Sequence, residues 1–124
     1  MRIDLGKNEL IHFVGIGGIG MSGLALIMKG LGYKVQGSDI SYNKNIERLS
    51  EKKIKVFLNH KKENIKKTTI LVTSSAIKKN NPEVLEANKK NLPIYTRGDM
   101  LGHIVSFMRN VVITGSHGKN TNPD

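Results

Sequence analysis

Residues 10–20, with the sequence LIHFVGIGGIG, decide the fold of this chain. The first part, Leu10–Ile16, is a short apolar run with β-branched side chains, which is typical of a strand buried on both faces. Glycines end this run, and after them apolar residues recur at intervals of three and four, namely Met21, Leu24, Ala25, Met28 and Leu31. That spacing predicts a helix with one apolar face, which Gly32 would end. The stretch therefore predicts a strand, a tight turn and a helix.

The rest of the chain alternates between segments typical of strands and of helices. Asn81 is placed to cap one of these helices, Pro82 suits its first turn, and the carboxylate of Glu83 would face the positive end of its dipole. We predict further strands at Tyr33–Asp39, Lys55–Leu58, Thr69–Ser74 and Leu92–Thr96, helices at Asn45–Lys52, 81–90 and Asp99–Met108, and a last strand at Asn110–Thr114.

This alternation predicts an α/β fold of the Rossmann-like kind. Strands that alternate with helices need crossover connections, which give a parallel sheet with helices on both faces. We expect five strands in the order 3-2-1-4-5. The segment Asn110–Thr114 should lie off the sheet as part of a following domain, so that residues 1–108 form one domain and 109–124 begin the next.

The composition argues against some classes of function. The chain has 124 residues and a net charge of +10, which raises the question of nucleic acid binding. Its lysines occur as scattered pairs, and three Tyr, three Phe and no Trp give no platform on which bases would stack. We therefore expect no nucleic acid partner. The charge would instead keep the protein in solution and attract an anionic substrate.

Other features place the protein in the cytoplasm and argue against a structural metal. No apolar run approaches the roughly 20 residues of a membrane span, and the amino terminus lacks the apolar stretch of a signal peptide. The absence of cysteine excludes disulfides. The four histidines are too dispersed to predict a zinc site, so we expect no metal and no membrane partner. The sequence does not indicate an oligomeric state.

The glycine turn predicts a site for a nucleotide diphosphate. Gly15–Gly20 fits the spacing G-x-G-x-x-G between a predicted strand and a predicted helix, and Asp39 follows 19 residues after Gly20. Glycines let bare N–H groups approach a pyrophosphate, whose charge the helix amino terminus favours. Asp39 would accept hydrogen bonds from a ribose hydroxyl. NAD, FAD and a UDP-sugar all satisfy this pattern.

A second glycine turn lies at the end of the chain. Gly115–Thr121, with the sequence GSHGKNT, follows a β-branched segment and approximates a loop that holds ATP phosphates. No predicted helix follows it before Asp124, so this segment should bind ATP poorly by itself.

Several motifs resemble, in order and spacing, the first quarter of the UDP-N-acetylmuramate:L-alanine ligases of the Mur ligase family. The resemblance spans about Ile11 to Lys119. The motifs that carry it are GIGGIGM at Gly15–Met21, GSD at 37–39, TSSAI at 73–77, NPE at 81–83, Arg97 with Met100 and Leu101, and TGSHGK at 114–119.

The resemblance implies the amino-terminal part of a three-domain cytoplasmic ligase. In such an enzyme, ATP and Mg²⁺ activate the muramate carboxylate, and the L-alanine amine then forms the first peptide bond of the peptidoglycan precursor. The part in hand would bind the UDP of UDP-N-acetylmuramic acid and would have no catalytic residue or cofactor of its own. The implied UDP contacts are the amides of Gly15, Ile16, Gly17, Gly18, Ile19 and Gly20 and the side chains of Ser38, Asp39, His60, Ser74 and Ser75.

The implied ATP loop departs from the family at one position. It comprises Gly115, Ser116, His117, Gly118, Lys119, Asn120 and Thr121, and Asn120 stands where the family has a hydroxyl residue suited to magnesium. Three alternatives remain open: a ligase that attaches an intact peptide to the same UDP-sugar for cell-wall recycling, an NAD(P)-binding Rossmann domain, and a basic nucleic-acid-binding module. The recycling ligase shares the UDP chemistry, so these motifs separate it poorly.

Overall fold

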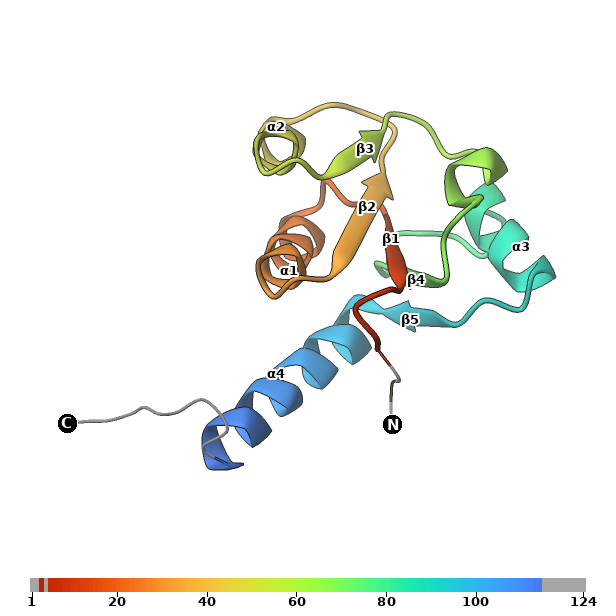
Figure 1. Cartoon of the computed structure of the whole chain (residues 1–124). Helices are drawn as coiled ribbons and strands as arrows, with labels where there is room; N and C mark the ends of the chain where they lie inside the picture. The colour runs from red at the N-terminus through yellow and green to blue at the C-terminus, as the bar shows by residue number, and fades with distance from the viewer. Residues whose placement is uncertain (1–2, 4, 115–124) are drawn as a thin grey trace.

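A five-stranded parallel sheet forms the centre of the computed structural model, which describes residues 3 and 5–114 (Figure 1). The strands are β1 (Leu10–Val14), β2 (Lys34–Ser38), β3 (Lys55–Phe57), β4 (Ile70–Thr73) and β5 (Ile94–Thr96). Their order is β3-β2-β1-β4-β5, and every neighbouring pair is parallel. The predicted fold class and strand order are therefore confirmed.

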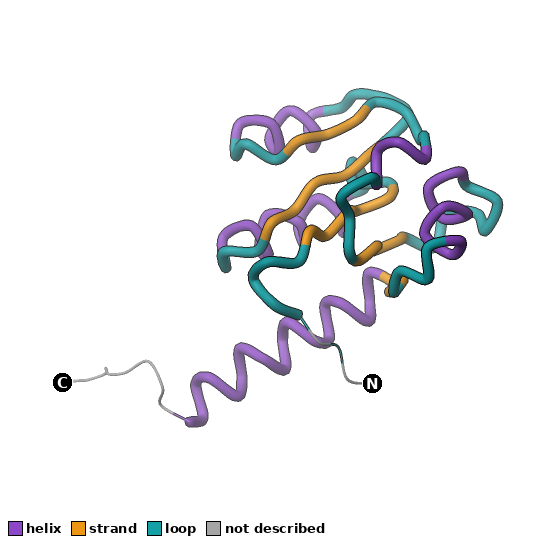
Figure 2. Tube along the Cα trace, turned by 45° about the vertical axis from the view of Figure 1, so that its right-hand side comes forward, coloured by secondary structure: helices purple, strands orange, loops and turns teal. Residues whose placement is uncertain are grey.

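Helices cover both faces of the sheet (Figures 1 and 2). They are α1 (Ile19–Gly30), α2 (Lys44–Glu51), α3 (Pro82–Lys89), α4 (Arg97–Thr114) and a short 3₁₀ helix, η1 (Lys62–Ile65). α1 contacts α2 and α4 on one face, whereas α3 contacts η1 on the other. Among the described residues, no helix is both long and apolar enough to cross a membrane.

Adjacent residues of the central strands point into two different hydrophobic cores. Phe13 of β1 and Val72 of β4 pack in the core beneath α1, α2 and α4. Val14 and Leu71, one position away on the same strands, pack with Val84 of α3 in the second core. This alternation explains why the buried strands show continuous apolar runs, because both of their faces are covered.

The crossovers leave β1 and β4 side by side at the point where the strand order reverses. β2 and β3 follow on one side of β1, and β4 and β5 lie on the other. Ligands of open parallel sheets bind at the carboxyl ends of the strands at such a point. The glycine turn directly follows β1, so it lies at this place in the fold.

Side chains cap three of the helices. Asn81 Oδ1 accepts a hydrogen bond from Glu83 N at 2.8 Å, which confirms the predicted start of α3, and Asn43 Oδ1 accepts one from Ile46 N at 2.9 Å in α2. Thr96 Oγ1 accepts a hydrogen bond from Asp99 N at 3.0 Å and fixes the start of α4. α4 therefore begins directly where β5 ends.

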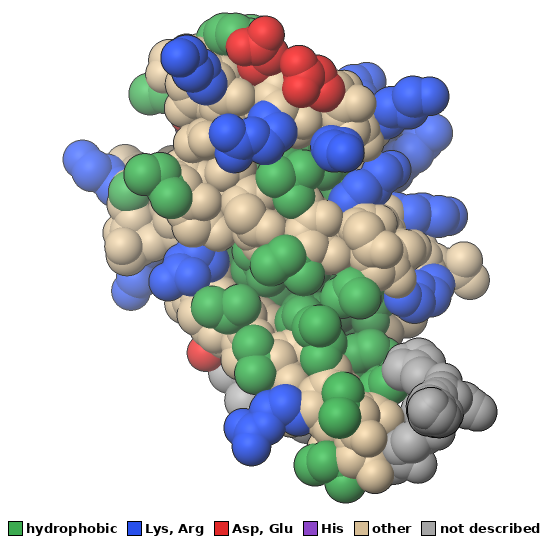
Figure 3. All heavy atoms as spheres, turned by 90° about the vertical axis from the view of Figure 1, so that its left-hand side faces the viewer, with side chains coloured by type: hydrophobic (Ala, Val, Ile, Leu, Met, Phe, Trp, Pro, Cys, Tyr) green, Lys and Arg blue, Asp and Glu red, His purple; other side chains and the backbone are tan. Residues whose placement is uncertain are grey.

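The predicted strand at Asn110–Thr114 is wrong, because α4 continues as a helix through these residues. β-branched side chains cost a helix only about 0.5 kcal/mol each, whereas a strand without a neighbour leaves its backbone groups unpaired. The end of α4 extends beyond the sheet, and the helix satisfies its own backbone (Figure 1). Apolar side chains gather on the lower half of the surface in Figure 3, where α4 lies, including the exposed Val105, Met108, Val112 and Ile113.

We expect Gly23→Ala to stabilise the protein by about 0.5–1 kcal/mol. Gly23 lies inside α1, and a Cβ at this position would have no heavy atom within 4 Å. Alanine should therefore restrict the unfolded chain without any steric cost in the folded state. Urea unfolding followed by circular dichroism measures the difference, and a loss of stability would contradict this account of the helix.

Candidate functional site

Four of the six amides of the glycine turn donate hydrogen bonds within the chain. Gly15 N and Ile16 N donate to Ser38 O at 2.9 and 3.0 Å, and Gly18 N donates to Gly15 O at 3.2 Å. Gly17 N donates to Asp39 Oδ2 at 2.8 Å. These four amides hold the turn in shape, so of the six predicted diphosphate contacts only the amides of Ile19 and Gly20 have no acceptor within the described residues.

Asp39 and two asparagines fix the position of Gly17. Besides the bond from Gly17 N, Asp39 accepts one from Ile40 N at 2.8 Å through Oδ1. The carboxamides of Asn43 and Asn45 donate to Gly17 O at 3.1 and 2.9 Å. Each Asp39 oxygen keeps a second lone pair, so the carboxylate both braces the turn and has acceptor capacity left at the end of β2.

The first turn of α1 has amides that remain unengaged. Within the described residues, Ile19 N, Gly20 N and Met21 N have no hydrogen-bond acceptor, as expected for the first three residues of a helix. Gly18, Ile19 and Gly20 are exposed. The turn therefore presents a helix amino terminus, with its partial positive charge, to solvent at the carboxyl edge of the sheet.

Arg97 lies against this helix terminus. A Cβ built on Gly20 would lie 2.9 Å from Arg97 Cδ and 3.0 Å from its Nε, so the side chain passes directly over Gly20. Arg97 is the first residue of α4, which the Thr96 cap fixes at the end of β5. The fold thus places a guanidinium group next to unengaged amides, and both favour an anion. The sequence alone gave no decisive role to Arg97.

A network of buried polar side chains lies below the carboxyl edge, between β1, β2 and α3. Glu83, which is fully buried, accepts hydrogen bonds from Ser38 Oγ at 2.6 Å and His12 Nε2 at 2.8 Å through Oε1. Through Oε2 it accepts from Asn64 Nδ2 at 2.6 Å and Lys61 N at 3.3 Å. Glu83 therefore connects strands, helix and loop, a function beyond the helix-dipole contact that the sequence predicts.

The network keeps Glu83 ionised. Burial by itself would raise the pKa of Glu83, but the hydrogen bonds from His12, Ser38 and Asn64 outweigh it and hold the pKa below its ordinary value. Gln36 Nε2 lies 2.9 Å from His12 Nδ1 and donates there, so the proton of His12 is on Nε2, facing Glu83. A carboxylate with this many donors is a stable buried anion.

The remaining predicted residues surround this edge of the sheet. Ser38 is fully buried and its hydroxyl belongs to the network, with His60 Nδ1 at 2.9 Å from Ser38 Oγ. Ser74 is close to the glycine turn, because a Cβ on Gly15 would lie 3.6 Å from Ser74 Oγ. Ser75 is exposed. Within the described residues, neither Ser74 nor Ser75 engages its hydroxyl in a hydrogen bond.

We expect Glu83→Gln to make the free energy of unfolding depend less steeply on pH in the acid range. Because the folded pKa of Glu83 is lowered, its contribution is complete above the unfolded value of about 4.3 and is lost as pH falls through the folded value. Urea unfolding of both proteins at several pH values below 5 measures how steeply the free energy of unfolding falls with pH. The control is Glu86→Gln, a part-exposed carboxylate of the same helix. Equal slopes for wild type and Glu83→Gln would contradict the assignment.

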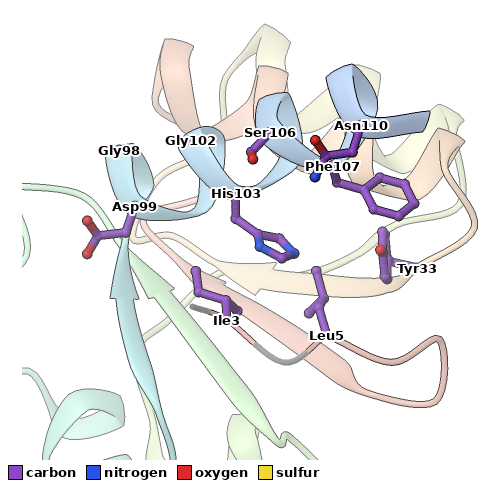
Figure 4. A pocket seen from close by; sticks show the side chains of 10 residues that line it. All are labelled: Ile3, Leu5, Tyr33, Gly98, Asp99, Gly102, His103, Ser106, Phe107 and Asn110. Atoms are coloured by element: carbon purple, nitrogen blue, oxygen red, sulfur yellow. The ribbon is translucent and has the colours of Figure 1, made fainter. Parts of the chain in front are cut away.

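A pocket of about 590 Å³ lies elsewhere, between α4 and the amino-terminal segment (Figure 4). The His103 ring points toward Ile3 and Leu5, and Tyr33 closes one end. None of the predicted site residues lines this pocket. Within residues 3 and 5–114, no group of three or more His, Cys, Asp or Glu side chains is arranged to hold a metal ion.

The sequence motifs include Arg97 and Glu83 without assigning either to the UDP contacts, and one predicted site lies outside the described residues. Arg97 and Glu83 are 77 and 63 residues away from Gly20 in the first turn of α1, so no local pattern links them to it. The predicted ATP residues, Gly115–Thr121, lie outside the described residues. α4 runs without a break across the predicted domain boundary between Met108 and Arg109.

Comparison with known proteins assigns the chain to a family. The profile of the Mur ligase family, catalytic domain, matches residues 10–109. A UDP-N-acetylmuramate:L-alanine ligase from Pelagibacter ubique is 66% identical over 98% of the chain. The chain spans about a quarter of the length of the curated relatives it matches, 26% in this case.

Solved structures agree with this assignment. The crystal structure of a UDP-N-acetylmuramate:alanine ligase from Thermotoga maritima is similar over 84% of this chain and 23% of its own, with a TM-score of 0.68 and 32% identity. A UDP-N-acetylmuramate:L-alanyl-γ-D-glutamyl-meso-diaminopimelate ligase from Neisseria meningitides matches 72% of this chain and 28% of its own, with a TM-score of 0.67 and 28% identity. With its glycine turn, its strand order and a profile match over most of its length, the chain belongs to the Mur ligase family.

Proposed function

We propose that this chain is the amino-terminal part of a UDP-N-acetylmuramate:L-alanine ligase and that it binds the UDP portion of UDP-N-acetylmuramic acid. The observation that carries this proposal is the juxtaposition of Arg97 with the unengaged amides of Ile19 and Gly20, at the switch point of the sheet. The 66% identity to a relative of that name supports the choice of substrate.

In this proposal, the diphosphate binds at the first turn of α1. Ile19 N and Gly20 N donate to phosphate oxygens, and the Arg97 guanidinium neutralises their charge. Gly15, Ile16, Gly17 and Gly18 shape the turn through their internal hydrogen bonds, and a Cβ on Gly17 would lie 2.7 Å from Asp39 Oδ2, so glycine there lets Asp39 approach the turn. The affinity for the diphosphate would therefore come from one helix terminus and one cation.

The uridine would extend along the carboxyl edge of the sheet. Asp39 has lone pairs left for a ribose hydroxyl at the end of β2. Ser74 and Ser75, at the end of β4, have hydroxyls without partners in the described part of the chain and would bind the uridine from the other side. His60 and Ser38 would form the floor of this site.

The complete protein would have two further domains that carry the chemistry. We infer that residues 109–124 begin the ATP-binding domain, and that Gly115–Thr121 would hold the ATP phosphates together with Mg²⁺. ATP supplies the phosphoryl group that activates the muramate carboxylate for attack by L-alanine. This part of the chain would orient the substrate without catalysing a step. The complete enzyme would act in the cytoplasm, where peptidoglycan precursors for cell shape and division are made.

Titration with four ligands tests the proposal. The purified chain is titrated with UDP-N-acetylmuramic acid, UDP, NADH and a short oligonucleotide while backbone amide signals are followed by NMR. We expect the two UDP ligands alone to shift Ile19, Gly20, Met21 and Asp39. Preferential binding of NADH or of the oligonucleotide at these residues would overturn the proposal.

A further inference from the structure

His60 is held by one ring nitrogen, and the other is unengaged. His60 Nδ1 lies 2.9 Å from Ser38 Oγ. Within the described residues, His60 Nε2 has no hydrogen-bond partner. The side chain is 13% exposed, so the ring is mostly buried but reaches solvent at the carboxyl edge, just after β3. Nε2 is therefore the ring nitrogen that is available to a ligand.

The buried network determines which nitrogen of His60 carries the proton. A serine hydroxyl has one hydrogen, and Ser38 Oγ donates it to Glu83 Oε1 at 2.6 Å. Glu83 cannot be the donor in this contact, because its carboxyl group is ionised. The hydrogen bonds around it outweigh the effect of burial and hold its pKa below the ordinary value. Ser38 Oγ must therefore accept from His60 Nδ1–H. The proton of neutral His60 is on Nδ1, and Nε2 is an acceptor.

We propose that His60 Nε2 accepts a hydrogen bond from the imide N3–H of the uracil base, and that Glu83 and Ser38 are positioning residues that hold His60 in this tautomer. This inference rests on the proposed function, since it requires a uridine ligand at this edge of the sheet. Uracil presents an N–H donor at position 3, whereas cytosine presents an acceptor there. The site would therefore select uracil over cytosine through one nitrogen.

The proposal is tested by the tautomer and by base selectivity together. Long-range ¹H–¹⁵N spectra of the imidazoles, recorded at about pH 8 where a free imidazole is neutral, show which nitrogen of His60 is protonated without any ligand. Affinities for UDP and CDP are measured on the same chain. We expect a proton on Nδ1 and a preference for UDP of about tenfold or more. Nε2 would accept a hydrogen bond from the uracil of UDP but would have no donor in the cytosine of CDP.

Three variants separate the parts of the proposal. His60→Ala should bring the ratio of the CDP and UDP dissociation constants close to one while binding of the diphosphate persists. Ser38→Ala should move part of the His60 proton to Nε2 and reduce the preference. If Ser38→Ala does not fold, Glu83→Gln, which retains the shape of the side chain, should give the same change in the spectrum. His103→Ala, a histidine on α4 outside the site, is the control.

The outcomes are distinguishable. A proton on His60 Nε2 in the wild-type chain, or an unchanged preference for UDP in His60→Ala, would overturn this inference and leave the proposed function intact. If neither UDP nor CDP binds the wild-type chain, the proposed function fails, and the inference about uracil fails with it whichever tautomer is observed.

Discussion

Gly37→Ala is expected to destabilise the protein by about 3 kcal/mol or more, a large part of the 5–15 kcal/mol that stabilises a typical domain. A Cβ on Gly37 would lie 2.5 Å from Ile16 Cδ1, 2.6 Å from Ile16 Cβ and 2.7 Å from Phe13 O. Phe13 pairs directly with Gly37 in the sheet, so its carbonyl cannot retreat without separating β1 from β2. Urea unfolding followed by circular dichroism measures the loss.

Two further variants show whether this steric explanation is correct. Gly23→Ala, which adds the same methyl group in open space, should not destabilise. Adding Ile16→Val to Gly37→Ala should recover little stability, because valine retains the Ile16 Cβ and the Phe13 carbonyl is unchanged. Near-wild-type stability of Gly37→Ala would mean that β2 is free to move away from β1, contrary to this packing.

This contact was not predicted from the sequence, whereas the strands that it joins were. The segment after β1 must cross closely over β2, and the glycine at 37 makes this possible. Hydrophobic periodicity and glycine placement are local signals, and they predicted the five strands. The strand order came from the Rossmann-like fold that the alternation of strands and helices predicted. The predicted strand ends differ from the observed ones by one or two residues, as at Leu10–Ile16 against Leu10–Val14, because the last residues of a strand carry no distinct pattern.

The error at Asn110–Thr114 has a different cause. Four consecutive β-branched residues favour a strand, but strand formation depends on a neighbour that supplies hydrogen bonds, and that neighbour is not encoded locally. α4, which is fixed at its start by Thr96, simply continues. The local preference is weak in comparison with the backbone hydrogen bonds that a continuing helix provides.

The candidate site was predictable in its place but not in its contacts. The glycine spacing located the turn, and Asp39 stands at the expected distance, but the same spacing suits a carboxylate that binds a ribose and one that braces Gly17 N. Glu83 and His12 are 71 residues apart in the sequence, and their contact depends on the packing of α3 against β1. Such long-range pairs carry no sequence signal.

Arg97→Ala is expected to weaken UDP binding about 10- to 100-fold, in line with the roughly 1.5–3 kcal/mol of a hydrogen bond to a charged group. Only the amides of the first turn of α1 would then oppose the diphosphate charge, because the neighbouring amides of the glycine turn are engaged within the chain. Arg97→Lys should recover part of the affinity, since it restores the charge without the planar pair of donors. Isothermal titration calorimetry with UDP at low and high salt measures both effects.

Arg109→Ala provides the matched control, because it removes the same charge from the exposed far part of α4. If long-range attraction by the net positive charge were responsible for binding, Arg97→Ala and Arg109→Ala would weaken it equally, and the difference from wild type would vanish at high salt. A loss confined to Arg97→Ala that persists at high salt would instead require direct contact. The contact between Arg97 and Gly20 predicts the second result, since the Arg97 side chain passes over the first turn of α1 and would share a phosphate with the unengaged amides there.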